Sequence, residues 1–194
     1  VASYAERMAL ELERKELSGQ FQRWRPEYME AVIAYNRSLG QPIYADANSS
    51  LRVTFGQVRG NQPKDGLTNQ PFTSLEGIVS KDTGLDPFNA PAKQLDLIRA
   101  KQYGDYVLPS LGTVPVNFLS TLDITGGNSG TATMNSKAQL VGLLFDGVYE
   151  SIIGDWDFDD SKNRAISVDA RYMLWVMEYM DGATNLLEEM TIAK

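Results

Sequence analysis

The segment Thr125-Gly-Gly-Asn-Ser-Gly130 places a serine hydroxyl among glycines. A serine hydroxyl becomes an effective nucleophile when a general base removes its proton. In such a loop the backbone N–H groups of Gly127 and Ser129 can converge on one point and stabilise the oxyanion of a tetrahedral intermediate. The glycines allow backbone angles that a side chain would forbid. The segment therefore predicts a serine-peptidase nucleophile loop, with Ser129 as nucleophile and Gly127 and Ser129 as the oxyanion hole.

Two other interpretations compete with this one. Glycine, asparagine and serine all favour turns, so the segment is also compatible with an ordinary hairpin turn. A Gly-x-Ser-x-Gly elbow of an α/β-hydrolase would lead from a strand into a helix. Here Ser129 is followed after Gly130 by Thr131-Ala-Thr133, which favours a strand. The flanking sequence therefore predicts strand, loop and strand.

The chain contains no histidine, although histidine is the usual general base for a serine nucleophile. The 194 residues are thus expected to hold the nucleophile half of a catalytic site and to lack the base half. We interpret the chain as a C-terminal piece of a larger enzyme that would not turn over substrate alone.

Leu140–Gly147 predicts a buried strand that ends in a carboxylate, Asp146. A carboxylate beside a peptide-binding strand pays a desolvation cost unless it meets a cation. The α-ammonium group of a peptide substrate would be such a cation. The alternative is that Asp146 and Gly147 form a solvated turn after the strand.

Composition excludes several other functions. A net charge of −7 leaves no basic face for nucleic acid. No apolar run approaches the roughly 18 residues that a membrane span needs. The chain has no cysteine, and Asp155–Asp160 lacks the glycine and glutamate of a calcium loop, since Asp160 and Ile166 occupy those positions. No metal and no cofactor are therefore expected.

Residue periodicity predicts helices first and strands afterwards. Residues 3–39 are expected to be helical, with a break at Gly19 and a second helix beginning near Pro26. Further helices are expected at 92–101, from Asp169 as N-cap, and at 185–190. The predicted strands are 51–55, 72–79, 114–122, 131–134, 139–145 and 164–168.

Five sequence blocks together closely resemble the bacterial family of dipeptidyl-peptidase 7 and dipeptidyl-peptidase 11. They are Tyr44–Gly56, Phe118–Gly130, Leu140–Gly147, Arg164–Tyr172 and Gly182–Leu186. The resemblance implies an exopeptidase that releases dipeptides from free peptide N-termini. It also implies a catalytic His and Asp upstream of Val1, a homodimeric parent, and a periplasmic or cell-surface location.

The resemblance further implies the fold class. It is mainly β with helices: the second β-barrel of a chymotrypsin-like double barrel, preceded by helices from an inserted helical domain and ending in helices. Residues 1–41 would be the end of the inserted domain, and residues 42–194 the C-terminal barrel with its terminal helices.

Site roles follow from the resemblance position by position. Ser129 matches the nucleophile, and the amides of Gly127 and Ser129 match the oxyanion hole. Asp146 matches the residue that holds the substrate amine, and Gly147 matches the position that sets the P1 preference. Glycine there leaves an uncharged pocket, which implies apolar P1 residues. The one local departure is Thr131-Ala132 after the nucleophile loop.

Two functions of other kinds remain open at this point. One is a periplasmic Gly-Asn-Ser-Gly endopeptidase, which would also cleave substrates with acetylated amino ends. The other is a peptide-binding module that kept the loop and lost the base.

Overall fold

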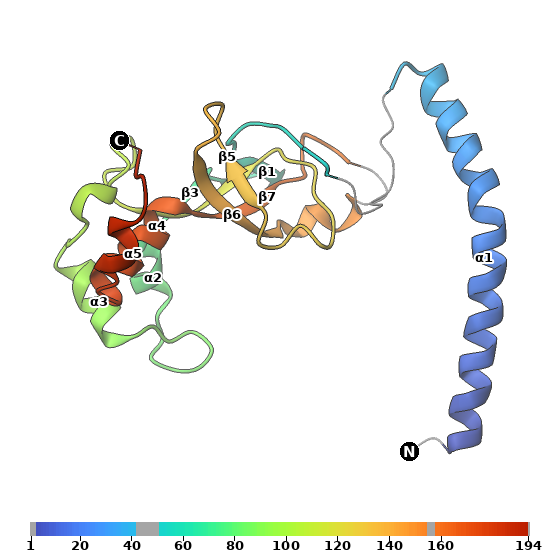
Figure 1. Cartoon of the computed structure of the whole chain (residues 1–194), viewed down its shortest axis with the longest axis horizontal. Coiled ribbons are helices and arrows are strands. Elements are labelled where there is room, and N and C mark those ends of the chain that lie inside the picture. Colours follow the sequence, from blue (N-terminus) through green and yellow to red (C-terminus); the bar gives the residue numbers. More distant parts are fainter. Residues whose placement is uncertain (1–2, 42–50, 155–157, 194) are drawn as a thin grey trace. The chain divides into compact units, whose positions relative to one another are not determined.

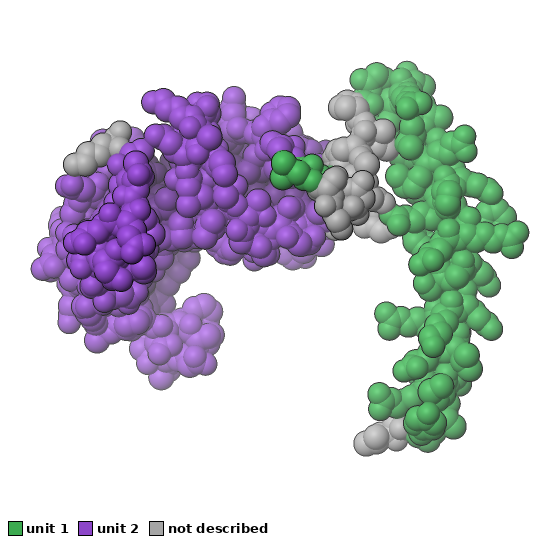
Figure 2. All heavy atoms as spheres, in the orientation of Figure 1, with its two compact units in different colours: residues 1–52 green, residues 53–194 purple. Residues whose placement is uncertain are grey.

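The computed structural model describes residues 3–41, 51–154 and 158–193. The chain divides into two compact units, Val1–Arg52 and Val53–Lys194, coloured separately in Figure 2. The domain boundary predicted between residues 41 and 42 lies at the edge of the residues that are not described, and it stays a prediction. The fold is mixed, with helices and antiparallel sheets.

The first unit contains one long helix, α1, from Tyr4 to Ser38 (Figure 1). Ser3 and Glu6 form a capping box at its start, and Gly40 follows its end with a φ of 68°. The expected break at Gly19 and new start near Pro26 are wrong, because α1 continues through both. Pro26 removes one backbone donor, but the surrounding Glu, Arg, Gln and Met residues are good helix formers.

The second unit is built on a five-stranded antiparallel sheet with the order β3-β4-β7-β6-β5. Its strands are β3 (Phe72–Ser74), β4 (Pro115–Ser120), β5 (Ala132–Met134), β6 (Leu140–Gly147) and β7 (Ala165–Asp169). A separate hairpin, which the sequence analysis did not predict, pairs β1 (Asn61–Lys64) with β2 (Leu67–Asn69).

Close packing over the sheet depends on a glycine in the middle of β6. A Cβ atom on Gly142 would lie 2.6 Å from Cε1 of Phe118 and 2.5 Å from the carbonyl oxygen of Val168. Phe118 is buried on β4. Because Gly142 has no side chain, β6 can pack closely against β7 and the Phe118 ring. This packing holds β6, the strand that carries Asp146.

Short helices gather at one end of the second unit (Figure 1). They are α2 (Leu75–Lys81), α3 (Ala92–Arg99), the 3-10 helix η1 (Gly104–Tyr106), α4 (Ala170–Trp175), the π-helix η3 (Val176–Met180) and α5 (Thr184–Glu188). Trp175 is fully buried at their centre, and its indole N–H donates to the carbonyl of Gln102 at 2.7 Å. Asp169 caps α4 as predicted, since its side chain accepts from the N–H of Arg171.

Most strands and the helix over 92–101 are confirmed within a few residues, but two strand predictions are wrong. Residues 72–79 form a strand only as far as Ser74, because the buried Leu75 starts α2. Residues 51–55 form no strand. Instead, the segment after them runs beside the end of β4, with hydrogen bonds from Arg59 N–H to Leu119 and from Thr121 N–H to Gln57.

Candidate active site

The predicted nucleophile loop connects β4 to β5 and is closed by a single side chain. The Oδ1 atom of Asn128 accepts from the N–H of Thr125 at 2.8 Å. The backbone of Asn128 bonds to Thr125 at 3.2 Å and to Thr131 at 2.9 Å. Side-chain acceptors of this kind stabilise tight turns. Asn128 had no predicted role, although its position inside the glycine-rich segment is the signal that could have revealed one.

Two of the three loop glycines have backbone angles that favour glycine. Gly127 has a φ of 102° and Gly130 a φ of 85°, both in the left-handed region. Gly126 is not among the glycines with a positive φ, so this residue does not use the freedom that glycine allows. The N–H of Gly130 donates to the carbonyl of Leu144 at 2.7 Å, which ties the loop to β6.

The N–H groups of Gly127 and Ser129 are unused. Within residues 3–41, 51–154 and 158–193, neither has a hydrogen-bond acceptor, and both residues are exposed to solvent. Exposed N–H groups without an internal acceptor can donate to a developing oxyanion. The Ser129 hydroxyl lies 3.5 Å from the carbonyl oxygen of Phe145. A carbonyl can accept that hydrogen bond but cannot act as a general base at neutral pH.

A β-bulge near the end of β6 sets the position of Asp146. Leu144 pairs with Ser167 and Asp146 pairs with Ile166, so Phe145 is the extra residue. Bulges redirect side chains and are common beside active sites. Phe145 and Asp146 are both exposed, and an oxygen of Asp146 accepts from the N–H of Gly147 at 2.8 Å.

The Asp146 carboxylate has no salt-bridge partner within the part of the chain that the structure describes. An exposed carboxylate held by one backbone N–H keeps further lone pairs for an external donor. The geometry therefore agrees with a carboxylate that can meet a cation. The loop-to-strand contacts of Ser129 and Gly130 bring the predicted residues of the loop and of β6 into one region.

Gly147 is half-buried where the nucleophile loop, β6 and the 3-10 helix η2 (Tyr149–Ile153) meet. A Cβ atom at position 147 would lie 3.5 Å from Cδ1 of Ile124 and 3.2 Å from Cβ of Ser151. The sequence analysis assigned no role to Ile124 or Ser151. Ile124 directly precedes the glycine-rich segment and Ser151 lies 21 residues after Gly130, but neither side chain has a chemistry that marks it as part of a site.

Comparison with known proteins shows the family of this chain. The family model described as Peptidase S46 matches residues 1–192. The chain belongs to the peptidase S46 family. The resemblance drawn from the five sequence blocks is therefore confirmed.

Named relatives in this family are dipeptidyl peptidases of two kinds. The Asp/Glu-specific dipeptidyl-peptidase of Shewanella putrefaciens is 44% identical over 215 residues, which cover 100% of this chain and 29% of the relative. The dipeptidyl-peptidase 7 of Phocaeicola vulgatus is 43% identical over 155 residues, covering 79% of this chain and 21% of the relative. The chain thus spans less than a third of the length of either relative.

A crystal structure of Porphyromonas endodontalis DPP11 in complex with the dipeptide Arg-Asp resembles this fold with a TM-score of 0.75 and 36% identity. The match covers 81% of this chain and 23% of that one. None of the described helices is long and apolar enough to cross a membrane.

Proposed function

We propose that this chain carries the nucleophile of a serine dipeptidyl aminopeptidase, which releases dipeptides from peptides with a free N-terminus. The observation that carries the proposal is the unused pair of N–H groups at Gly127 and Ser129. They lie in a loop tied to the strand that presents Asp146. Membership in a family whose named relatives are dipeptidyl peptidases supports it.

In this proposal a general base takes the proton of Ser129 Oγ as it attacks the carbonyl carbon of the second peptide residue, and the N–H groups of Gly127 and Ser129 receive the oxyanion. The scissile C–N bond then breaks, the leaving amine takes the proton from the base, and water hydrolyses the acyl-enzyme to release the dipeptide. Asp146 pairs with the α-ammonium group of the substrate. When Asp146 holds the substrate amine, only two residues fit between that amine and the scissile bond, so the product is a dipeptide.

The general base and its orienting carboxylate would come from outside these 194 residues. The chain has no histidine, and the relatives are more than three times as long. Residues 42–194 would then be the second barrel of a chymotrypsin-like double barrel, and residues 1–41 the end of the inserted helical domain. A homodimeric parent and a periplasmic or cell-surface location belong to the same proposal and rest on family resemblance.

The proposed P1 preference is for apolar residues. Names of the relatives do not decide this point, since both Asp/Glu-specific enzymes and dipeptidyl-peptidase 7 are among them. The argument rests on Gly147, which supplies no cation to pair with an acidic P1 side chain. An acidic P1 side chain that is buried in the pocket without a cationic partner would bind poorly.

The proposal is tested by labelling the full-length protein that contains this chain. The reagent is a dipeptidyl diphenyl phosphonate with leucine at P1 and a free amino end, and peptide mapping by mass spectrometry locates the adduct. We expect one adduct, on Ser129, which is lost in Ser129→Ala. Ser136→Ala, a change of another exposed serine in the nearby turn, should leave labelling intact. Labelling of another residue, or unchanged labelling in Ser129→Ala, would contradict the proposal.

A further inference from the structure

The space beside Gly147 is limited by one neighbouring side chain. A Cβ atom built on Gly147 would approach Cβ of Ser151 to 3.2 Å, which is tighter than ordinary van der Waals contact. Its other near neighbours, Cδ1 of Ile124 at 3.5 Å and the carbonyl oxygen of Arg164 at 3.6 Å, are at normal distances. Whether position 147 can hold a side chain therefore depends on whether Ser151 can move.

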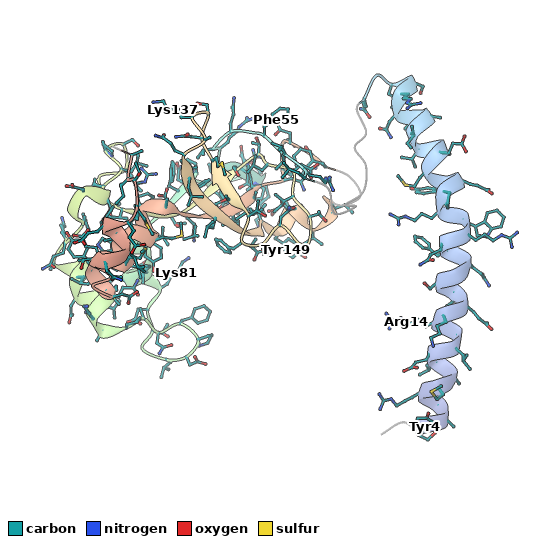
Figure 3. The ribbon with its side chains drawn as sticks, in the orientation of Figure 1. Tyr4, Arg14, Phe55, Lys81, Lys137 and Tyr149 are labelled. Atoms are coloured by element: carbon teal, nitrogen blue, oxygen red, sulfur yellow. The ribbon has the colours of Figure 1, made fainter. Side chains whose placement is uncertain are left out.

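Ser151 is held in place by two hydrogen bonds to one residue. Its hydroxyl donates to the carbonyl of Arg164 at 3.1 Å and accepts from the N–H of Arg164 at 2.9 Å. The same carbonyl accepts from the N–H of Val148 at 3.0 Å, and the N–H of Ser151 donates to the carbonyl of Val148 at 2.8 Å. Helix η2, which begins at the labelled Tyr149 in Figure 3, is thus fastened to the start of β7.

Arg164 is itself immobilised. It is only 2% exposed, and its guanidinium group donates to backbone carbonyls. The acceptors are the carbonyls of Arg59, Gly60, Asp160 and Asn163. Burial lowers the pKa of this guanidinium, opposed by the charges of Asp160 and Asp159. Arg164 bonds to several segments at once. Ser151, which is bonded to Arg164, therefore cannot move away from position 147 without disturbing those hydrogen bonds.

We infer that Ser151 is a second specificity-determining residue, whose fixed Cβ atom keeps position 147 open and uncharged. The inference rests on the proposed role of Gly147 in the P1 pocket. It means that an arginine at position 147 cannot enter this pocket freely, even though such a residue would pair with an acidic P1 side chain. A switch to acidic P1 residues then needs a change at position 151 together with the change at position 147.

The test compares Gly147→Arg alone, Gly147→Arg with Ser151→Gly, and Gly147→Arg with Ser151→Ala in the full-length protein. The measurement is kcat/KM for dipeptide anilides with aspartate or leucine at P1, with thermal unfolding as the check on folding. We expect the Ser151→Gly double variant to cleave the aspartate substrate at least on the order of tenfold faster than Gly147→Arg alone. Ser151→Ala, which keeps the Cβ atom, should rescue less.

A second pair isolates the steric contact from charge. Gly147→Ala adds only the Cβ atom, so we expect it to raise KM for the leucine substrate, and Ser151→Gly in the same protein should reverse part of that increase. If Gly147→Arg alone matches its Ser151→Gly double variant, or if Gly147→Ala gains nothing from Ser151→Gly, the inference about Ser151 fails and the peptidase proposal stands. If the aspartate-to-leucine ratio moves in no variant, the proposed role of Gly147 in the pocket fails.

Discussion

At the scale of single residues, the candidate site depends on a hydroxyl and a carboxylate that come from different segments. Ser129 belongs to the loop after β4, and Asp146 stands at the end of β6. The contact between Ser129 Oγ and the Phe145 carbonyl joins the two segments. Because a bulge places Phe145 outside the regular pairing, Asp146 is turned to solvent beside the nucleophile loop.

The proposed role of Asp146 predicts a selective loss. Asp146→Asn keeps the shape and removes the charge, so substrates with a free amino end should lose about 2 kcal/mol of binding, or roughly 30-fold in kcat/KM. The measurement is steady-state kinetics of the full-length protein with a dipeptide anilide.

Asp65→Asn is the matched control, because Asp65 and Gly66 form another exposed Asp-Gly pair, in the turn of the β1–β2 hairpin. We expect this variant to behave like the unchanged protein. Equal kinetics for Asp146→Asn and the unchanged protein would remove the amine-binding role from Asp146.

The sequence marks some candidate site residues and not others, for a physical reason. Gly127, Ser129 and Asp146 lie in short segments whose chemistry is local, so the sequence can mark them as candidates, and the family resemblance is what gives Asp146 its predicted role. Ser151 acts through a contact with Gly147 and two hydrogen bonds to Arg164, 13 residues further along the chain. Such contacts exist only once η2 and β7 are folded together.

At the scale of elements, the nucleophile loop owes its form to Asn128. Asn128→Ala removes the side-chain acceptor of the Thr125 N–H, a solvent-exposed turn bond worth about 0.5–1.5 kcal/mol. The loop that presents the Gly127 and Ser129 amides would then lose its fixed geometry. We expect kcat to fall by roughly tenfold or more, with a smaller change in KM. Steady-state kinetics of the full-length protein measures both.

Asn135→Ala provides the control for that variant. The Oδ1 atom of Asn135 accepts from the N–H groups of Lys137 and Gln139 in the β5–β6 turn, where Figure 3 labels Lys137. Asn135→Ala therefore removes the same kind of side-chain-to-backbone hydrogen bond, but in a turn that does not contain Ser129. A similar fall in kcat in both variants would show that the effect comes from general loosening and not from the nucleophile loop.

The errors in the predicted elements also have local causes. Phe72 to Val79 does not alternate as a strand would: the apolar residues after Phe72 are Leu75, Ile78 and Val79, a spacing that suits a helix. Burial of Leu75 and the hydrogen bond from its N–H to the carbonyl of Val114 begin a helix there. The long α1 shows the reverse case, since Gly19 and Pro26 did not outweigh the helix formers around them. Where the helix and strand propensities of a segment are similar, tertiary contacts and neighbouring residues decide which element forms.

At the scale of the whole molecule, the second unit has its own sheet and a hydrophobic core among its helices. The chain nevertheless contains only some of the catalytic groups that the proposed function needs. The second unit buries Trp175, Leu75 and Val114 completely, so it has a core that can hold β4 and β6 in register. Family membership, which could be recognised from sequence blocks, supports the proposal that the general base comes from outside these 194 residues.

The most direct test of the central claim is a comparison of amino ends. The full-length protein is assayed with a dipeptide anilide carrying leucine at P1, once with a free amino group and once acetylated, beside Ser129→Ala. We predict cleavage of the free substrate alone, abolished by Ser129→Ala. Equal cleavage of the acetylated substrate would indicate an endopeptidase and contradict the account. Cleavage of neither this pair nor the corresponding pair with aspartate at P1 would indicate a binding module and contradict it as well.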